Sequence, residues 1–348
     1  MKAAAVYAPN DIRIVEIPTP RPSPGEVIVR IRACGICGSD LPRVFGDGAH
    51  FYPVVIGHEA AGEVVEVGPE VSGVKEGDKV AIAPLVPCMK CDNCLRGGYS
   101  LCKQYSFIGS RRQGCMAEYV AVPAMCLLKI PADLSFEEAA MVEPATVPLH
   151  GLLKCGTLGG RRVAVLGTGT IGLLAVQWAK FLGASEVVAV DINERKLEMA
   201  HALGADILVN PARIGESLVQ AVTSISGREG YDLVVETAGI PVTQVQAVEV
   251  AANGGTVLYV GTAHKEVQFP ADVFEKIIRK ELTLLGSWMS YSPPFPGREW
   301  ALAIRALSDG RIKIGGMITH KYGLSQARTA FETLRSCPDA VKVIMVGD

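Results

Sequence analysis

The chain has 348 residues, 49% of them hydrophobic and 20% charged, and a formal net charge of −2 at pH 7. This length suits two domains with sizeable cores, and the near-neutral charge argues against a general nucleic-acid binder. Residues 1–18 contain no cleavable signal-type segment, and no apolar run is long enough to span a membrane. We therefore expect a cytoplasmic protein with no nucleic-acid or membrane partner.

The first third of the chain carries the pattern of short β-strands. Residues 26–35 alternate apolar and charged side chains, as a half-buried strand does. Residues 62–84 read as two strands joined by glycine- and proline-marked turns, and residues 118–123 as another. These strands predict a compact, barrel-like β domain over residues 1–150.

After residue 150, strand and helix patterns alternate, and the strands are continuous apolar runs. Strands are expected at 161–167, 186–191, 206–210, 232–239, 256–263 and 281–287. Helices are expected at 171–183, 194–204, 218–225 and 242–252. The pattern predicts the α/β class, with a doubly wound parallel sheet over residues 151–287 whose faces are both covered by helices.

The last segment, residues 288–348, begins with an irregular stretch rich in proline and aromatic residues. Two helices, at 299–310 and 325–335, and a strand at 341–346 are expected to follow it. We expect this segment to return to the first domain.

A loop at residues 88–102 carries four cysteines at spacings of three, three and eight: Cys88, Cys91, Cys94 and Cys102. Four thiolates this close in sequence can form a closed tetrahedral shell around one zinc ion, which would stabilise the loop without binding substrate. The other cysteines are scattered, so a reducing compartment is a better inference than a disulfide framework.

A second group of metal-ligand residue types is dispersed in the chain: Cys37, His58, Glu59 and Glu143. A catalytic zinc needs about three protein ligands and one open position. Each residue also has an ordinary structural reading. His58 could be a buried hydrogen-bonding histidine, and Glu143 an acid at a helix start. Spacing alone does not show that the four converge.

A glycine-rich turn, GTGTIG, lies between an expected strand and an expected helix, the setting required of a dinucleotide fingerprint. The candidate cofactor-binding residues are Gly167, Gly169, Thr170, Ile171, Gly172 and Asp191. The backbone around Gly169 can approach a pyrophosphate at the helix N-terminus. Asp191, 19 residues after Gly172, can bind the ribose hydroxyls and repel a 2′-phosphate, which favours NAD over NADP.

Taken together, residues 58–69, the four-cysteine loop, GTGTIG and the Glu-Pro pair at Glu143 resemble the zinc-dependent medium-chain dehydrogenases over the whole chain. The resemblance implies a GroES-like catalytic domain, a Rossmann domain, two zinc ions per chain and NAD. It implies Cys37, His58 and Glu143 as catalytic zinc ligands, with Glu59 either ligating directly or standing behind them. Ser39 resembles the hydroxyl that starts the proton relay. The carboxylate of Glu143 at this ligand position resembles the pattern of the polyol dehydrogenase branch of the family.

Three segments, residues 37–59, 107–115 and 280–300, resemble members of this family that oxidise phosphorylated hexitols. Arg43, Arg111 and Arg112 are the candidate phosphate ligands, because arginine donates two parallel hydrogen bonds to a phosphate. One alternative is a dehydrogenase of free polyols such as sorbitol, or of another secondary alcohol such as threonine. Another is a non-catalytic protein that binds NAD and zinc. A homodimer or homotetramer is expected.

Overall fold

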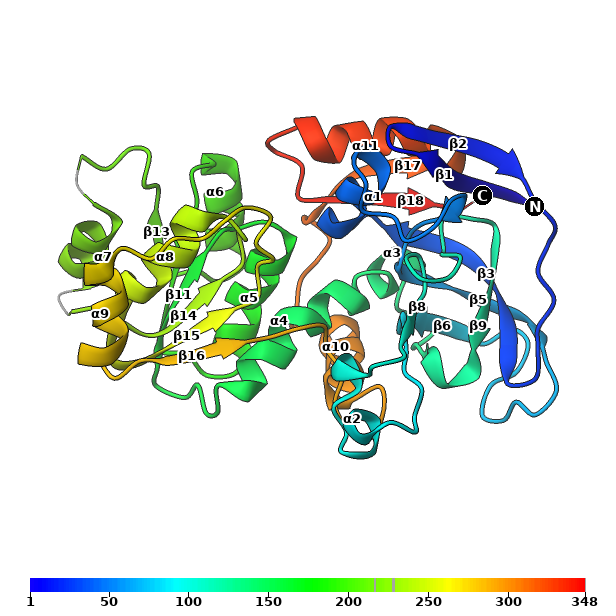
Figure 1. Ribbon diagram of the computed structural model, residues 1–348, viewed down its shortest axis with the longest axis horizontal. Helices are drawn as coiled ribbons and strands as arrows, with labels where there is room; N and C mark the ends of the chain where they lie inside the picture. The colour runs from blue at the N-terminus through cyan, green and yellow to red at the C-terminus, as the bar shows by residue number, and fades with distance from the viewer. Residues whose placement is uncertain (216, 227–228, 348) are drawn as a thin grey trace. The chain divides into compact units, whose positions relative to one another are not determined.

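The computed structural model describes residues 1–215, 217–226 and 229–347, and the chain forms two compact units (Figure 1). Unit 1 comprises Met1–Glu143 and Tyr291–Asp348, and unit 2 comprises Pro144–Ser290. The divisions thus fall at 143/144 and 290/291 rather than at the sequence-based 150/151 and 287/288. Among the described residues, no helix combines the length and apolarity needed to cross a bilayer.

Unit 1 is built mainly of antiparallel strands around a seven-stranded sheet. Its order is β10-β6-β5-β3-β18-β17, with β9 also paired to β3. The strands of this sheet are β3 (Glu26–Gly35), β5 (Glu59–Val67), β6 (Lys79–Ile82), β9 (Tyr119–Pro123), β10 (Leu127–Lys129), β17 (Ile318–Gly323) and β18 (Lys342–Val346). Two smaller sheets contain β1 (Lys2–Ala8), β2 (Asp11–Glu16) and β4 (Val54–Val55), and β7 (Leu85–Val86) and β8 (Ser106–Phe107).

The C-terminal segment completes the main sheet of unit 1. Strand β18 pairs antiparallel with β3, with Ile344 opposite Gly35, and pairs parallel with β17. Its side chains are almost all buried, which explains why an apolar strand at the chain end returns to the first domain. The helices of this unit are α1 (Leu41–Phe45), α2 (Asp92–Leu95), α3 (Phe136–Ala139), α10 (Arg298–Ser308) and α11 (Ala327–Ser336).

Unit 2 is a six-stranded, fully parallel sheet in the order β13-β12-β11-β14-β15-β16, which confirms the predicted fold class. The strands are β11 (Arg162–Leu166), β12 (Glu186–Val190), β13 (Ile207–Val209), β14 (Tyr231–Glu236), β15 (Ala251–Tyr259) and β16 (Thr283–Gly286). The order reverses between β11 and β14, the place where ligands bind in open α/β sheets. The turns after these two strands contain GTGTIG and Ala238.

The helices of unit 2 pack along this sheet (Figure 1). Helices α5 and α6 contact each other, and α8 contacts both α7 and α9. Their bounds are α5 (Thr170–Phe181), α6 (Glu194–Ala202), α7 (Leu218–Ser226), α8 (Pro241–Val250) and α9 (Ala271–Arg279). Helix α4 (Val142–Lys154) runs across the division between the units. Helix α9 was not expected from the sequence, and the start of α4 was considered only in the structural reading of Glu143 as an acid at a helix start. Both contain few consecutive apolar residues, and α9 leaves Phe274 and Ile278 exposed.

Candidate active site and metal centres

The four cysteine sulfurs of the 88–102 loop lie within 4.8 Å of one another. The Cys91 sulfur is 3.6 Å from that of Cys94 and 3.9 Å from that of Cys102, and the Cys88 and Cys94 sulfurs are 3.9 Å apart. A tetrahedron with zinc–sulfur bonds of about 2.3 Å has edges of about 3.8 Å. The donor set therefore fits one zinc ion with no open position.

The short helix α2 and the local backbone shape this cysteine loop. Backbone hydrogen bonds from Cys94 and Lys103 lower the pKa of the Cys91 thiol to about 6, which favours the thiolate that a metal requires. Burial raises the pKa of Cys94 to about 12, so this thiol needs a cation nearby to ionise. All ten cysteines of the chain are free of disulfides.

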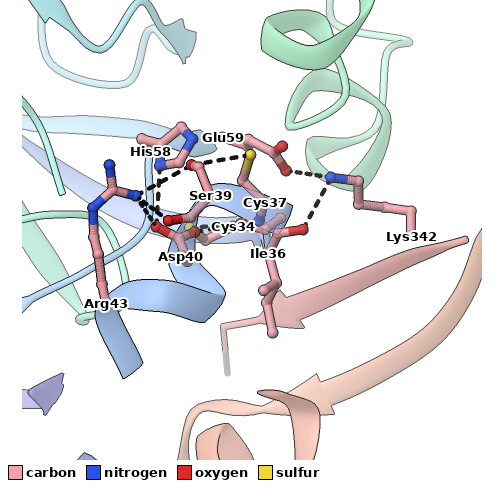
Figure 2. Close-up of polar contacts among 10 residues, drawn as sticks. Cys34, Ile36, Cys37, Ser39, Asp40, Arg43, His58, Glu59 and Lys342 are labelled. Carbon is pink, nitrogen blue, oxygen red and sulfur yellow. Dashed lines mark hydrogen bonds and ion pairs between the residues drawn. The ribbon is translucent and has the colours of Figure 1, made fainter. Parts of the chain in front are cut away.

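A second cluster brings together Cys37, His58 and Glu59, whose ligand atoms also lie within 4.8 Å of one another (Figure 2). Cys37 follows β3, and His58 directly precedes β5, the strand that pairs with it. His58 and Glu59 are buried, whereas Cys37 is half-buried and Ser39 is exposed. The cluster therefore has a buried floor and reaches the surface of unit 1 beside Ser39.

Glu143, at the start of α4, is not among the residues whose ligand atoms lie within 4.8 Å of one another in this cluster. Burial raises the pKa of its carboxyl to about 7, while the charges of His58, Glu59, Lys342 and Asp40 also act on it. These interactions place Glu143 in the electrostatic surroundings of the cluster. A cation at the cluster would favour its ionised form.

Lys342 on β18 is a charged neighbour of the cluster that sequence reasoning missed. Its Nζ donates to Glu59 Oε2 at 2.5 Å and to the Ile36 carbonyl at 3.1 Å, and both charged side chains are almost fully buried (Figure 2). Burial opposes the charge on Lys342, but the Glu59 carboxylate holds its pKa above the ordinary value. The single lysine in VKVIMV was the available signal, because a charge in a buried strand needs a partner.

The carboxylate of Glu59 also explains the glycine opposite it. Gly35 is the register partner of Glu59 in the β3–β5 pair. A Cβ atom at Gly35 would lie 2.2 Å from Glu59 Oε2, far inside contact distance. The close approach of strand and carboxylate therefore requires glycine at this position.

A polar network behind Cys37 joins Ser39, Asp40 and Arg43 (Figure 2). The Ser39 hydroxyl donates to Cys37 Sγ at 3.3 Å. Arg43 donates from one nitrogen to the Ser39 carbonyl at 2.8 Å, to Ser39 Oγ at 3.1 Å and to Asp40 Oδ1 at 3.0 Å. Arg43 thus orients the loop that presents Ser39.

Asp40 is completely buried and links this network to His58. Its Oδ1 is 3.4 Å from His58 Nδ1, and its Oδ2 accepts from the Cys37 backbone at 3.2 Å. Burial opposes ionisation of Asp40, but His58 and Arg43 hold its pKa below the ordinary value. A carboxylate behind a ligating histidine fixes the ring orientation and raises its basicity as a ligand.

The three candidate phosphate-binding arginines have different surroundings. Arg43 lies beside Ser39. Partial burial and the positive charges of Arg111 and Arg43 lower the pKa of His50. Arg111 stacks over Tyr105, 4.5 Å from the ring centre. Arg112 instead forms an ion pair with Glu26 at 2.7 Å. Its charge is already matched by this neighbour.

The glycine-rich turn has the backbone geometry of a tight strand-to-helix connection. Gly167 has φ +92°, and a Cβ at Gly172 would lie 1.8 Å from the Gly167 carbonyl oxygen, so neither position accepts a side chain. Within the described chain, a Cβ at Gly169 would meet nothing within 4 Å. Helix α5 begins at Thr170 with Gly169 as its N-cap, followed by half-buried Ile171. The open face of the turn therefore suits an approaching phosphate.

Asp191 directly follows β12, and its carboxylate faces the glycine-rich turn. Oδ2 accepts from the Thr168 backbone at 2.7 Å and from the Thr168 hydroxyl at 3.0 Å, while Oδ1 accepts from the Asn193 backbone at 2.9 Å. The predicted fingerprint residues and the acid are thus neighbours in unit 2.

Comparison with known proteins places these features in context. The profile described as "Alcohol dehydrogenase GroES-like domain" matches residues 23–132, and the one described as "Zinc-binding dehydrogenase" matches residues 170–309. The chain is 43% identical over 296 residues to galactitol 1-phosphate 5-dehydrogenase of Escherichia coli K12, covering 85% of each protein. It is 33% identical over 342 residues to sorbitol dehydrogenase of Bombyx mori, covering 96% of this chain and 95% of that protein.

Solved structures show the same architecture. The galactitol-1-phosphate dehydrogenase of Escherichia coli matches with a TM-score of 0.95 and 39% identity, covering 99% of this chain and 100% of that chain. A protein described as a zinc-binding dehydrogenase of Sinorhizobium meliloti 1021, bound to NADP, matches with a TM-score of 0.89 and 32% identity, covering 99% of this chain and 98% of that chain.

Proposed function

Because this chain belongs to the zinc-binding alcohol dehydrogenase family, we propose that it oxidises a secondary alcohol of a phosphorylated hexitol with NAD, converting galactitol 1-phosphate to tagatose 6-phosphate. The observation that carries the substrate proposal is one cation, Arg43, beside the Cys37–His58–Glu59 cluster, with a second cation, Arg111, near His50. Arg43 contacts Ser39 of the cluster's loop, and Arg111 acts with Arg43 on His50. The 43% identity to a galactitol 1-phosphate dehydrogenase supports the same substrate.

We assign two zinc ions to each chain. The cysteine loop has the sulfur spacing of a closed structural site. Cys37 and His58 would hold the second ion, with Glu143 as the third ligand that the family resemblance implies. Glu59, whose carboxylate pairs with Lys342, would stand behind them. A zinc ion held there would supply Lewis acidity toward the substrate hydroxyl.

The residues around this site have separate roles in the oxidation. Ser39 Oγ would accept the proton of the substrate hydroxyl as its own proton leaves for water, since Arg43 has no acceptor atom and cannot receive it. Asp40 holds His58 in one orientation, and Arg43 holds the Ser39 loop. The carbon that loses hydride becomes the ketone carbon. A bound nicotinamide supplies the hydride acceptor. Asp191 favours NAD as its source, because a carboxylate repels the 2′-phosphate of NADP.

Arg111 is the sharper test of the phosphate, because it lacks the structural contacts that Arg43 makes with Ser39 and Asp40. We expect Arg111→Gln to lower kcat/KM for galactitol 1-phosphate about tenfold or more, since a hydrogen bond to a charged group contributes roughly 1.5–3 kcal/mol. Slow oxidation of free galactitol should change little. Steady-state kinetics on both substrates with the purified enzyme measures the two effects.

The adjacent arginine provides a matched control. Arg112→Gln removes an equal charge from the same loop, but Arg112 is paired with Glu26. It should therefore leave the preference for the phosphorylated substrate unchanged. Equal losses of Arg111→Gln on both substrates would assign Arg111 a structural role. If the wild-type enzyme prefers free galactitol or sorbitol, its substrate is a free polyol and not a hexitol phosphate.

We also propose that two copies of the chain associate through the open edge of the parallel sheet. This pair would be the whole of a homodimer or one half of a homotetramer. Within the described chain, the outer edge of β16 has no strand partner, and its sequence, Thr-Leu-Leu-Gly, lacks the charges and prolines that usually protect an edge. Leu284 on this strand and Phe274 and Ile278 on α9 are exposed. A second copy offers the same apolar edge and face by twofold symmetry.

Ile278, the more exposed of the two α9 side chains, tests this interface. Ile278→Glu should convert the oligomer to a smaller species at the same protein concentration, because the new charge must be desolvated on association. Light scattering coupled to size-exclusion chromatography measures the mass. Leu95→Glu, at a similarly exposed apolar residue of the cysteine loop, should leave the mass unchanged. A monomeric wild type, or an unchanged mass for Ile278→Glu, would contradict the proposal.

A further inference from the structure

Thr168, between the first two glycines of the turn, makes contacts that the glycine fingerprint does not require. Its side chain is completely buried. Both its backbone N–H and its hydroxyl donate to the same atom, Asp191 Oδ2, at 2.7 and 3.0 Å. An ordinary residue at this position would contribute only the backbone donor. The hydroxyl therefore adds a second tie between the turn and the acid.

The two hydrogen bonds from Thr168 go to only one of the two oxygens of the Asp191 carboxylate. An ionised carboxylate has about four acceptor positions, two on each oxygen. Thr168 fills both positions of Oδ2, while the Asn193 backbone fills one position of Oδ1. One acceptor position remains, and it lies on Oδ1. A ribose hydroxyl would therefore be accepted by Asp191 at Oδ1.

The threonine side chain also limits how far the carboxylate can turn. A β-branched residue has few χ1 rotamers, and burial removes the space for others, so the hydroxyl is held at one place. Donors at both oxygens then hold the plane of the Asp191 carboxylate. A carboxylate held in one plane cannot rotate away from an incoming 2′-phosphate, whose charge it repels.

We propose that Thr168 is a positioning residue that orients the Asp191 carboxylate through Oδ2 and thereby strengthens the selection of NAD over NADP. The inference rests on the proposed role of Asp191 in NAD binding. The selection between NAD and NADP would then depend on a side chain inside the glycine-rich turn as well as on Asp191. The residue acts through Asp191.

The test compares NAD and NADP binding to the zinc-loaded enzyme by isothermal titration calorimetry, which is independent of turnover. Thr168→Val keeps the shape and removes the hydroxyl. It should weaken NAD binding about tenfold, the scale of one hydrogen bond to a charged group, while NADP binding is unchanged or improved. Thr168→Ser keeps the hydroxyl and should stay close to wild type in the ratio of the two dissociation constants.

A double-mutant cycle with Asp191→Ala separates the possible failures. If Thr168 acts through Asp191, Thr168→Val should not change the NAD/NADP ratio further in the Asp191→Ala background. Equal weakening of both nucleotides by Thr168→Val, or the same loss in both backgrounds, would overturn the inference and leave a packing role. An unchanged ratio in Asp191→Ala alone would instead overturn the proposed NAD selectivity. If Thr168→Val does not fold, Thr168→Ala replaces it in the same cycle.

Discussion

Replacing Cys37 with serine is expected to abolish dehydrogenase activity while the protein remains folded. Cys37 is half-buried, beside buried His58 and Glu59, and its thiolate is one of the ligands that we assign to the catalytic ion. Loss of the ion removes several kcal/mol of transition-state stabilisation, so kcat/KM should fall roughly a thousandfold or more. Metal analysis should show two zinc ions per wild-type chain and one in Cys37→Ser, with little change in the unfolding midpoint.

Two cysteine variants serve as controls for this experiment. Cys91→Ser should lower stability or prevent folding, since metal binding at a closed site is coupled to folding. Cys337→Ser, at a half-buried free cysteine outside both clusters, should leave zinc content and activity unchanged. A fully active wild type with one zinc ion and no other divalent metal would contradict the two-site assignment.

Replacing Lys342 with methionine is expected to destabilise unit 1 strongly. The Lys342–Glu59 pair is nearly solvent-free, with side-chain exposures of 3% and 2% and a separation of 2.5 Å. Removing one partner of a buried pair leaves an uncompensated charge, which costs about 3–5 kcal/mol. Urea unfolding followed by circular dichroism should show this loss, and zinc content should be measured on the same samples.

The origin of that loss can be separated from general damage to β18. The double variant Lys342→Met with Glu59→Gln removes the unpaired charge and should recover a large part of the stability. Lys321→Met breaks the ion pair with Glu137, whose side chains are 51% and 35% exposed, and should cost about 1 kcal/mol or less. If Lys342→Met were no more damaging than Lys321→Met, the buried pair would not have the importance that its geometry indicates.

The sequence by itself determined the features that depend on neighbours along the chain. The alternation of apolar strands and amphipathic helices after residue 150 predicted the parallel sheet, because burial on both faces leaves a continuous apolar pattern. The turn GTGTIG was identified because its glycines lie within one strand–helix connection. The cysteine loop was recognisable for the same reason. In each case the chemistry is local, so residue type and spacing carry most of the information.

Only the tertiary structure decided which distant residues meet. Glu59 and Lys342 are brought together because β18 joins the same sheet as β3 and β5, a pairing that no spacing reveals. The structure likewise paired Arg112 with Glu26, and placed Arg43 against Ser39 and Asp40. An isolated arginine in a sequence has no visible partner. A buried charge becomes interpretable only when the fold shows which opposite charge offsets its desolvation.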